Sequence, residues 1–211
     1  MEKKKGKKGS VYSRRAFLKG MGGGAAGAAL ATGLLGRGFS AGQAEAAAAP
    51  VYAGKPVRFT VNGRKVALEV EPRETLLEVL RKRLKLTGAK KVCDRGECGG
   101  CTVLLDGHPV YSCLFPAVRA DGKAVTTIEG LAEGDSLNPV QQAFIDKDGY
   151  QCGFCTPGFI LSSAALLERN PAPSLPEIRS ALSGHICRCG NYVKIYDAVA
   201  TAASRMKARK A

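Results

Sequence analysis

Eight cysteines are the residues of this 211-residue chain whose spacing could support metal or redox chemistry, and they form two sets of four. The first set has the spacing C-x4-C-x2-C-x11-C and comprises Cys93, Cys98, Cys101 and Cys113. Its C-x4-C-x2-C start is the plant-type spacing of a [2Fe–2S] ligand loop. Such a loop must curl to bring four thiolates onto two irons, and Gly96, Gly99 and Gly100 permit the tight turns. The pattern favours iron–sulfur binding over zinc or structural disulfides.

The second set has the spacing C-x2-C followed later by C-x-C, and comprises Cys152, Cys155, Cys187 and Cys189. We expect its first pair at the N-terminus of one helix and its second pair just before another. A helix N-terminus favours thiolate and lowers thiol pKa from about 8.5. Two such termini facing each other would make a positive pocket for an anionic cluster. Taken alone, this set also fits zinc.

The N-terminal quarter of the chain reads as an export signal. Residues 13–19 spell SRRAFLK, the twin-arginine pattern, and an uncharged Gly/Ala-rich stretch follows over residues 20–36. That stretch is too short and too weakly hydrophobic for a stable membrane span. Cleavage after 44–46, 46–48 or a neighbouring small-residue triplet fits the pattern. The alternative is a basic arm on a cytosolic protein.

This interpretation assigns residues 1–49 to a twin-arginine signal peptide and linker, and predicts a periplasmic protein carried by the twin-arginine machinery. That route transports folded chains, which suits metal insertion before export. Eight cysteines in an exported protein would otherwise suggest a disulfide framework.

The charge distribution argues against a nucleic-acid partner. The formal net charge is +14, but residues 1–49 hold nine of the 32 Lys and Arg against two of the 18 acidic residues. Half of the charge therefore belongs to the targeting segment. No basic patch with interleaved aromatic residues occurs in the remainder.

Two domains must position the cysteines. Residues 55–131 predict a small α+β domain, with a hairpin around Asn62-Gly63, a helix over 74–85, strands over 102–105 and 110–112 joined by Asp106-Gly107, and a short strand after residue 123. Residues 138–208 predict four helices. The first two helices cover 139–148 and 156–168. The third begins at a capping box from Ser174 to Glu177, and the fourth begins after a cap at Asn191.

The stretches CDRGECGGCTV…YSC and GYQCGFCTPGF…HICRCGNY together resemble the small iron–sulfur subunit of the xanthine oxidase family of molybdenum hydroxylases. The resemblance covers residues 56 to about 205, in both spacing and order. It implies an α+β chain: an N-terminal β-grasp ferredoxin-like domain followed by an all-α four-helix domain, each holding one [2Fe–2S] cluster through four cysteines. The export signal is similar to that of the periplasmic aldehyde oxidoreductases.

The resemblance also implies partners. The small subunit of this family carries no catalytic residue. A large partner subunit binds molybdopterin cytosine dinucleotide and oxidises an aldehyde or an N-heterocycle. Electrons then pass through the two clusters to an FAD-binding medium subunit or to an external acceptor. Gln151 and Cys189 are implied to approach the pterin.

One residue departs from the family pattern. His185 stands where an Asn usually precedes the I/L-C-R-C motif. It could replace a Cys as a Rieske-type ligand, but all four Cys are present, so we expect it to cap a turn or to lie at the surface. The alternative function for the whole chain is an exported metal- or disulfide-stapled binding protein without a redox role.

Overall fold

The computed structural model describes residues 53–210, with side chains through residue 208. The predicted signal peptide and linker, residues 1–49, lie outside the described residues. The two predicted domain boundaries further along the chain, 55–131 and 138–208, remain predictions. The described residues belong to a single structural unit.

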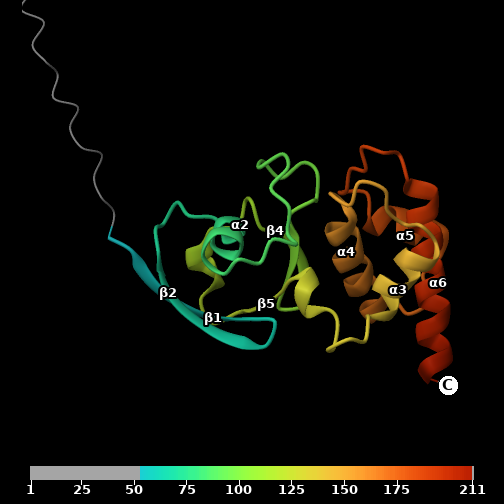
Figure 1. The fold of residues 1–211 in the computed structure, drawn as a ribbon, viewed down its shortest axis with the longest axis horizontal. Coiled ribbons are helices and arrows are strands. Elements are labelled where there is room, and N and C mark those ends of the chain that lie inside the picture. The colour runs from blue at the N-terminus through green and yellow to red at the C-terminus, as the bar shows by residue number, and fades with distance from the viewer. Residues whose placement is uncertain (1–52, 211) are drawn as a thin grey trace, which may run out of the picture. The chain divides into compact units, whose positions relative to one another are not determined.

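A five-stranded mixed sheet forms the first half of the described chain (Figure 1). Its order is β2-β1-β5-β3-β4, with β1 parallel to β5 and the other neighbouring pairs antiparallel. The strands are β1 (Lys55–Val61), β2 (Arg64–Val70), β3 (Thr102–Leu105), β4 (His108–Tyr111) and β5 (Ala124–Thr126).

Both predicted hairpin turns are confirmed. Asn62 and Gly63 have φ angles of 50° and 77°, and Asp106 and Gly107 have 49° and 79°. Positive φ at both central residues belongs to the turn that matches the twist of paired strands. The second hairpin matters most for the site, because it leads from Cys101 through β3 and β4 to Cys113.

The helix predicted over 74–85 is shorter than expected, and its hydrogen bonding changes from the α-helical to the π-helical pattern along its length. It consists of α2 (Leu76–Glu78) followed by a π-helical turn, η1 (Val79–Arg83), closed by a bond from Leu84 N–H to the Val79 carbonyl at 3.1 Å. A capping box between Thr75 and Glu78 starts it. Two 3₁₀ turns complete this half: η2 (Ala117–Ala120) and η3 (Ile128–Gly130).

The second half is helical, as predicted. Its helices are α3 (Pro139–Asp146), α4 (Thr156–Arg169), α5 (Leu175–Ala181) and α6 (Tyr192–Lys210). Capping boxes from Asn138 and Ser174 start α3 and α5. The Asn191 side-chain amide donates to the Asp148 carbonyl at 2.8 Å, and this bond ties the start of α6 to the end of α3.

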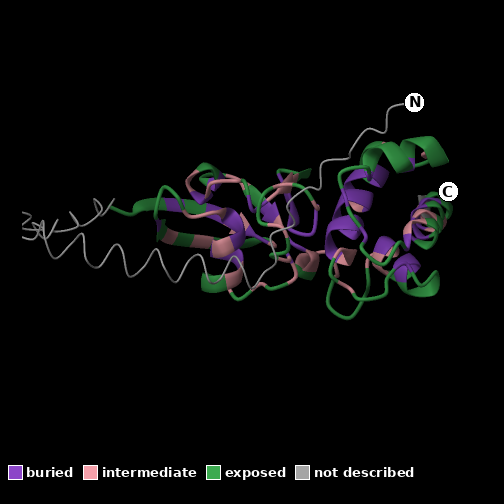
Figure 2. Ribbon diagram, turned by 90° about the horizontal axis from the view of Figure 1, so that it is seen from above, coloured by how far each residue is buried: buried purple, intermediate pink, exposed green. Residues whose placement is uncertain are grey.

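Each half has its own apolar core (Figure 2). One core lies between the sheet and α2, and the other lies among α3, α4, α5 and α6. A third, small cluster of Leu104, Leu161 and Ala165 joins β3 to α4, so the two halves pack directly against each other. This arrangement confirms the α+β class. No helix within residues 53–210 is long and apolar enough to cross a membrane.

Candidate metal centres

The loop that carries the first cysteine set lies between η1 and β3. Gly96 and Gly99 adopt the left-handed region, with φ of 77° and 71°, as the glycine-rich sequence predicted. The Lys90 N–H donates to the Gly100 carbonyl at 2.9 Å and closes the base of the loop. The sulfurs then meet in two pairs, Cys93 with Cys98 and Cys101 with Cys113.

The two pairs of the first set have different surroundings. Backbone N–H groups, first that of Arg95 and then that of Glu97, surround the Cys93 sulfur and lower its pKa to about 7. Burial raises the pKa of Cys101 to about 12, because its thiolate would lose contact with water. The loop therefore already directs hydrogen-bond donors at one sulfur, and such donors stabilise extra electron density on a ligand.

A buried serine connects the second pair of this set to the rest of the domain. Ser112 is fully buried, and its hydroxyl donates to the Cys101 carbonyl at 2.6 Å. Its own carbonyl accepts from the Leu77 N–H at 3.1 Å. These two bonds fix Cys113, the next residue, relative to both Cys101 and α2.

The second cysteine set also forms two pairs, Cys152 with Cys189 and Cys155 with Cys187. Cys152 and Cys189 are exposed, whereas Cys187 is buried. Cys155 is the residue before the first turn of α4, as predicted. The Cys187 sulfur accepts from the Asn191 N–H at 3.4 Å, at the start of α6.

The expected lowering of thiol pKa at the start of α4 is wrong for Cys155. Burial raises its pKa to about 12, and the neighbouring Cys187 thiol adds to this effect. Desolvation of the thiolate outweighs the helix dipole here. The exposed Cys152 behaves in the expected direction, since the Phe154 N–H lowers its pKa.

The donor set fits [2Fe–2S] clusters. All eight cysteines lie within the described residues, and none of them is paired in a disulfide there. Within residues 53–210, no three Cys, His, Asp or Glu side chains gather as they would around one metal ion. Four thiolates arranged as two pairs suit two irons, whereas a single zinc ion needs four ligands around one centre.

The two cysteine sets adjoin through their backbones. The Ile186 N–H donates to the Cys98 carbonyl at 3.1 Å, so the residue before Cys187 is bonded to a residue of the first set. Gln151 and Cys189, the two residues expected to approach a pterin, are both exposed. They lie at the solvent side of the second set.

His185 differs from expectation. It does not lie at the surface, because it is 6% exposed and its ring lies between the two halves. Its backbone N–H donates to the Leu182 carbonyl at 3.0 Å, in the turn that follows α5. Its Nε2 is 3.1 Å from the hydroxyls of Thr102 and Ser162. Burial lowers its pKa to about 4, so the ring is neutral near pH 7. The sequence offered no sign of Thr102 or Ser162 beyond the position of Thr102 next to Cys101.

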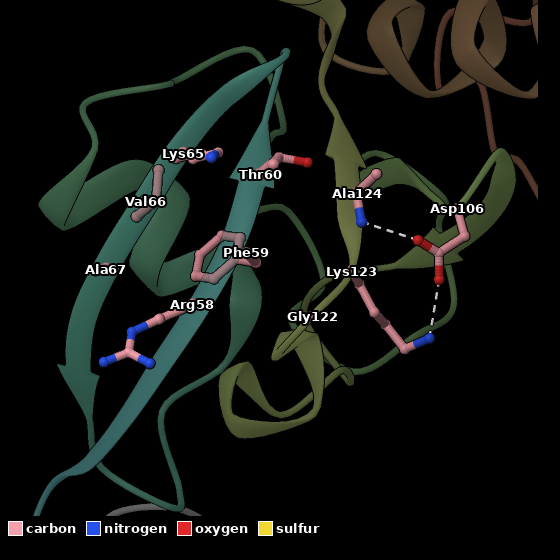
Figure 3. Close-up of a pocket in the computed structure, with 10 residues that line it drawn as sticks. All are labelled: Arg58, Phe59, Thr60, Lys65, Val66, Ala67, Asp106, Gly122, Lys123 and Ala124. Atoms are coloured by element: carbon pink, nitrogen blue, oxygen red, sulfur yellow. Dashed lines mark hydrogen bonds and ion pairs between the residues drawn. The ribbon is translucent and has the colours of Figure 1, made fainter.

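A groove of about 500 Å³ lies apart from the cysteines, on the face formed by β1, β2 and the segment leading into β5 (Figure 3). Its polar lining includes Arg58, Lys65, Asp106 and Lys123. Asp106 bonds Lys123 and the Ala124 N–H, at 2.9 and 2.8 Å. Its carboxylate therefore holds the turn after β3 against β5.

Two family models match the chain in succession. A model described as "2Fe-2S iron-sulfur cluster binding domain" matches residues 59–130, and one described as "[2Fe-2S] binding domain" matches residues 127–200. The first spans the cysteine loop and sheet, and the second spans the helices. Their order agrees with the two halves of the fold.

Relatives and solved structures agree with these matches. The aldehyde oxidoreductase iron-sulfur-binding subunit PaoA of Escherichia coli K12 is 45% identical over 76% of this chain and 77% of its own. The nicotine 6-hydroxylase small subunit of Paenarthrobacter nicotinovorans is 49% identical over 66% of this chain and 84% of its own. The crystal structure of quinoline 2-oxidoreductase from Pseudomonas putida 86 aligns with a TM-score of 0.70 at 41% identity, covering 74% of this chain and 97% of that one. The chain belongs to the iron–sulfur subunits of the molybdenum hydroxylase family.

Proposed function

We propose that the eight cysteines hold two [2Fe–2S] clusters in an electron-transfer subunit, with one thiol pair on each iron. When bound, each cluster supplies a one-electron redox centre. The observation that carries the proposal is the arrangement of free thiols as two pairs in each half. The relatives are subunits of oxidoreductases, which supports the same role for this chain.

The chain's own residues prepare these sites in different ways. The first set is mostly enclosed: Cys101 and Cys113 are buried and Ser112 fixes their backbone. The second set reaches the surface through Cys152 and Cys189. We therefore assign the second set to the side where electrons enter from a partner, and the first set to the exit toward an FAD-binding subunit or an external acceptor.

The partner at this entry side is a large subunit carrying molybdopterin cytosine dinucleotide. The Gln151 amide can hydrogen-bond the edge of a heterocycle, and Cys189 offers a ligating sulfur at the surface. Exposed apolar side chains flank these residues in the sequence: Tyr150, Phe154 and Ile186 are 44%, 58% and 52% exposed. Large exposed apolar groups mark protein interfaces.

Replacement of Phe154 tests this assignment. Phe154→Asp should weaken co-purification of the large subunit at least tenfold, because it places a charge in an apolar contact. Leu175→Asp is the matched control, since Leu175 is similarly exposed, at 46%, but starts α5 outside the cysteine loops. Equal loss in both variants, or in neither, would contradict the assignment of this face.

The predicted export of the chain is the second part of the proposal. The SRRAFLK motif supports transport of the folded, cluster-loaded subunit into the periplasm by the twin-arginine machinery. Replacement of Arg14 and Arg15 by lysine should leave precursor in the cytoplasm, as measured by fractionation and immunoblotting. Normal export of this variant would show that another route is used.

A further inference from the structure

One ring nitrogen links three segments that carry cysteines. His185 lies two residues before Cys187, and its Nε2 is 3.1 Å from both Thr102 Oγ1 and Ser162 Oγ. Thr102 is the residue after Cys101 in the first set. Ser162 lies on α4, whose first turn follows Cys155. The imidazole thus bonds to side chains next to both cysteine sets.

The count of protons fixes the direction of the bond across the two halves. The Thr102 hydroxyl donates its single proton to the Gly99 carbonyl at 2.7 Å. Its oxygen must then accept from His185, so the imidazole carries its proton on Nε2. On this count, Nδ1 is the unprotonated nitrogen of the neutral ring.

The backbone around His185 is held by the first half at both neighbouring residues. The Tyr111 hydroxyl donates to the Gly184 carbonyl at 2.6 Å, and the Ile186 N–H donates to the Cys98 carbonyl at 3.1 Å. A Cβ on Gly99 would meet His185 Cδ2 at 2.6 Å, so the ring fits against bare backbone there. The Phe159 ring packs against the imidazole with the centroids 5.0 Å apart.

We propose that His185 is a positioning residue that sets the separation and orientation of the two cysteine sets. It thereby governs electron passage between the clusters that the sets hold, and in this respect the inference rests on the proposed function. Without its ring, the Thr102 oxygen loses its donor and the segment before Cys187 loses its side-chain attachment to both β3 and α4. Losing one partner of a buried hydrogen bond costs free energy, and without these bonds the two loops are held less firmly relative to each other.

The test uses the full iron-loaded chain and a matched pair of serines on α4. Ser162→Ala removes one hydroxyl from His185. Ser163→Ala removes a neighbouring buried hydroxyl that has no hydrogen-bond partner among the described residues. The readouts are iron content, the magnetic interaction between the two reduced clusters by EPR, and the rate of electron equilibration between them.

His185→Leu and Thr102→Val should keep both clusters but lose the wild-type EPR splitting and slow equilibration. Ser162→Ala should do the same to a smaller extent. His185→Gln should restore the splitting in part, because its amide N–H can replace Nε2–H. Ser163→Ala and the exposed His108→Gln should match wild type.

Wild-type splitting and rate in both His185→Leu and Thr102→Val would overturn the role of His185. Should His185→Leu lose iron through misfolding, the isosteric Thr102→Val and the Ser162–Ser163 comparison still decide the question. Failure of the proposed function itself would show differently, as wild-type protein without iron.

Discussion

At the scale of single residues, the surroundings of each thiol distinguish the members of each cysteine set. In the first set, backbone N–H groups surround Cys93 while Cys101 is buried. In the second set, Cys152 is exposed beside the Phe154 N–H while Cys155 is desolvated. Both sets therefore offer one outer pair and one inner pair, which gives the two ends of each bound cluster different environments.

Single cysteine replacements should separate the two sites. Cys155→Ser should remove the cluster of the helical half and stop electron delivery from the partner, while the EPR signal of the first half persists. Cys101→Ser is the reciprocal control and should remove only the other signal. Each variant should retain about half of the iron of wild type, because each site binds two irons. Loss of both signals from either variant would contradict independent sites.

At the scale of elements, Arg81 in η1 bonds the chain that leads into the first cysteine loop. The Arg81 Nη1 donates to the carbonyls of Thr87 and Ala89, both at 2.8 Å. These residues lead into the loop that carries Cys93. Next to it, Lys82 pairs with Glu78 at 2.7 Å and its side chain is 68% exposed.

The neighbouring basic residues provide a matched test. Arg81→Met should lower the free energy of unfolding by about 2 kcal/mol, because two charge-assisted hydrogen bonds to backbone are lost. Lys82→Met should cost less than about 0.5 kcal/mol, as exposed i,i+4 pairs do. Denaturant titration of both loaded proteins measures the difference. Similar costs for the two variants would show that Arg81 does not hold the loop.

The elements themselves were largely predictable, for local reasons. Asn62-Gly63 and Asp106-Gly107 specify turns with positive φ, and the capping box at Ser174 is a short-range signal. The π-helical turn in η1 was not predictable, because helical spacing of leucines does not distinguish bonding to the fourth from bonding to the fifth residue. His185 was misplaced because its burial depends on Thr102 and Ser162, far away in the sequence.

In the candidate sites, too, local sequence predicts some features, whereas contacts between distant residues decide others. The grouping of cysteines into two sets follows from spacing alone, and the structure brings each set together as thiol pairs. Which thiols pair, and which are buried, depends on how the chain after β4 brings Cys113, and the chain between α5 and α6 brings Cys187 and Cys189, back to the earlier loops. Ser112 and Arg81 were missed because each acts through backbone carbonyls, and no motif marks such contacts.

At the scale of the whole described chain, the two halves meet where the first turn of α4 lies close to the backbone of Gly99 in the first cysteine loop. A Cβ on Gly158, in the first turn of α4, would collide with the Gly99 carbonyl oxygen. Neither atom belongs to a flexible side chain, so relief requires movement of the loop or the helix. The close contact of the two cysteine-bearing regions therefore depends on glycine at this position.

Gly158→Ala should consequently force the halves apart. We expect a loss of about 1–3 kcal/mol in the free energy of unfolding, as for other overpacked sites, together with a weaker magnetic interaction between the clusters. Glu168→Ala, on an exposed position of the same helix, should stay within about 0.5 kcal/mol of wild type. A fully stable Gly158→Ala protein with unchanged EPR spectra would refute this contact.

The most direct measurement of the central claim is metal and sulfide analysis, with EPR, of the full chain isolated from the compartment where it works. Cysteines that hold two [2Fe–2S] clusters predict about four irons and four acid-labile sulfides per chain, and two distinct signals after reduction with dithionite. A colourless protein containing zinc, or one whose eight thiols are oxidised to disulfides, would contradict the account.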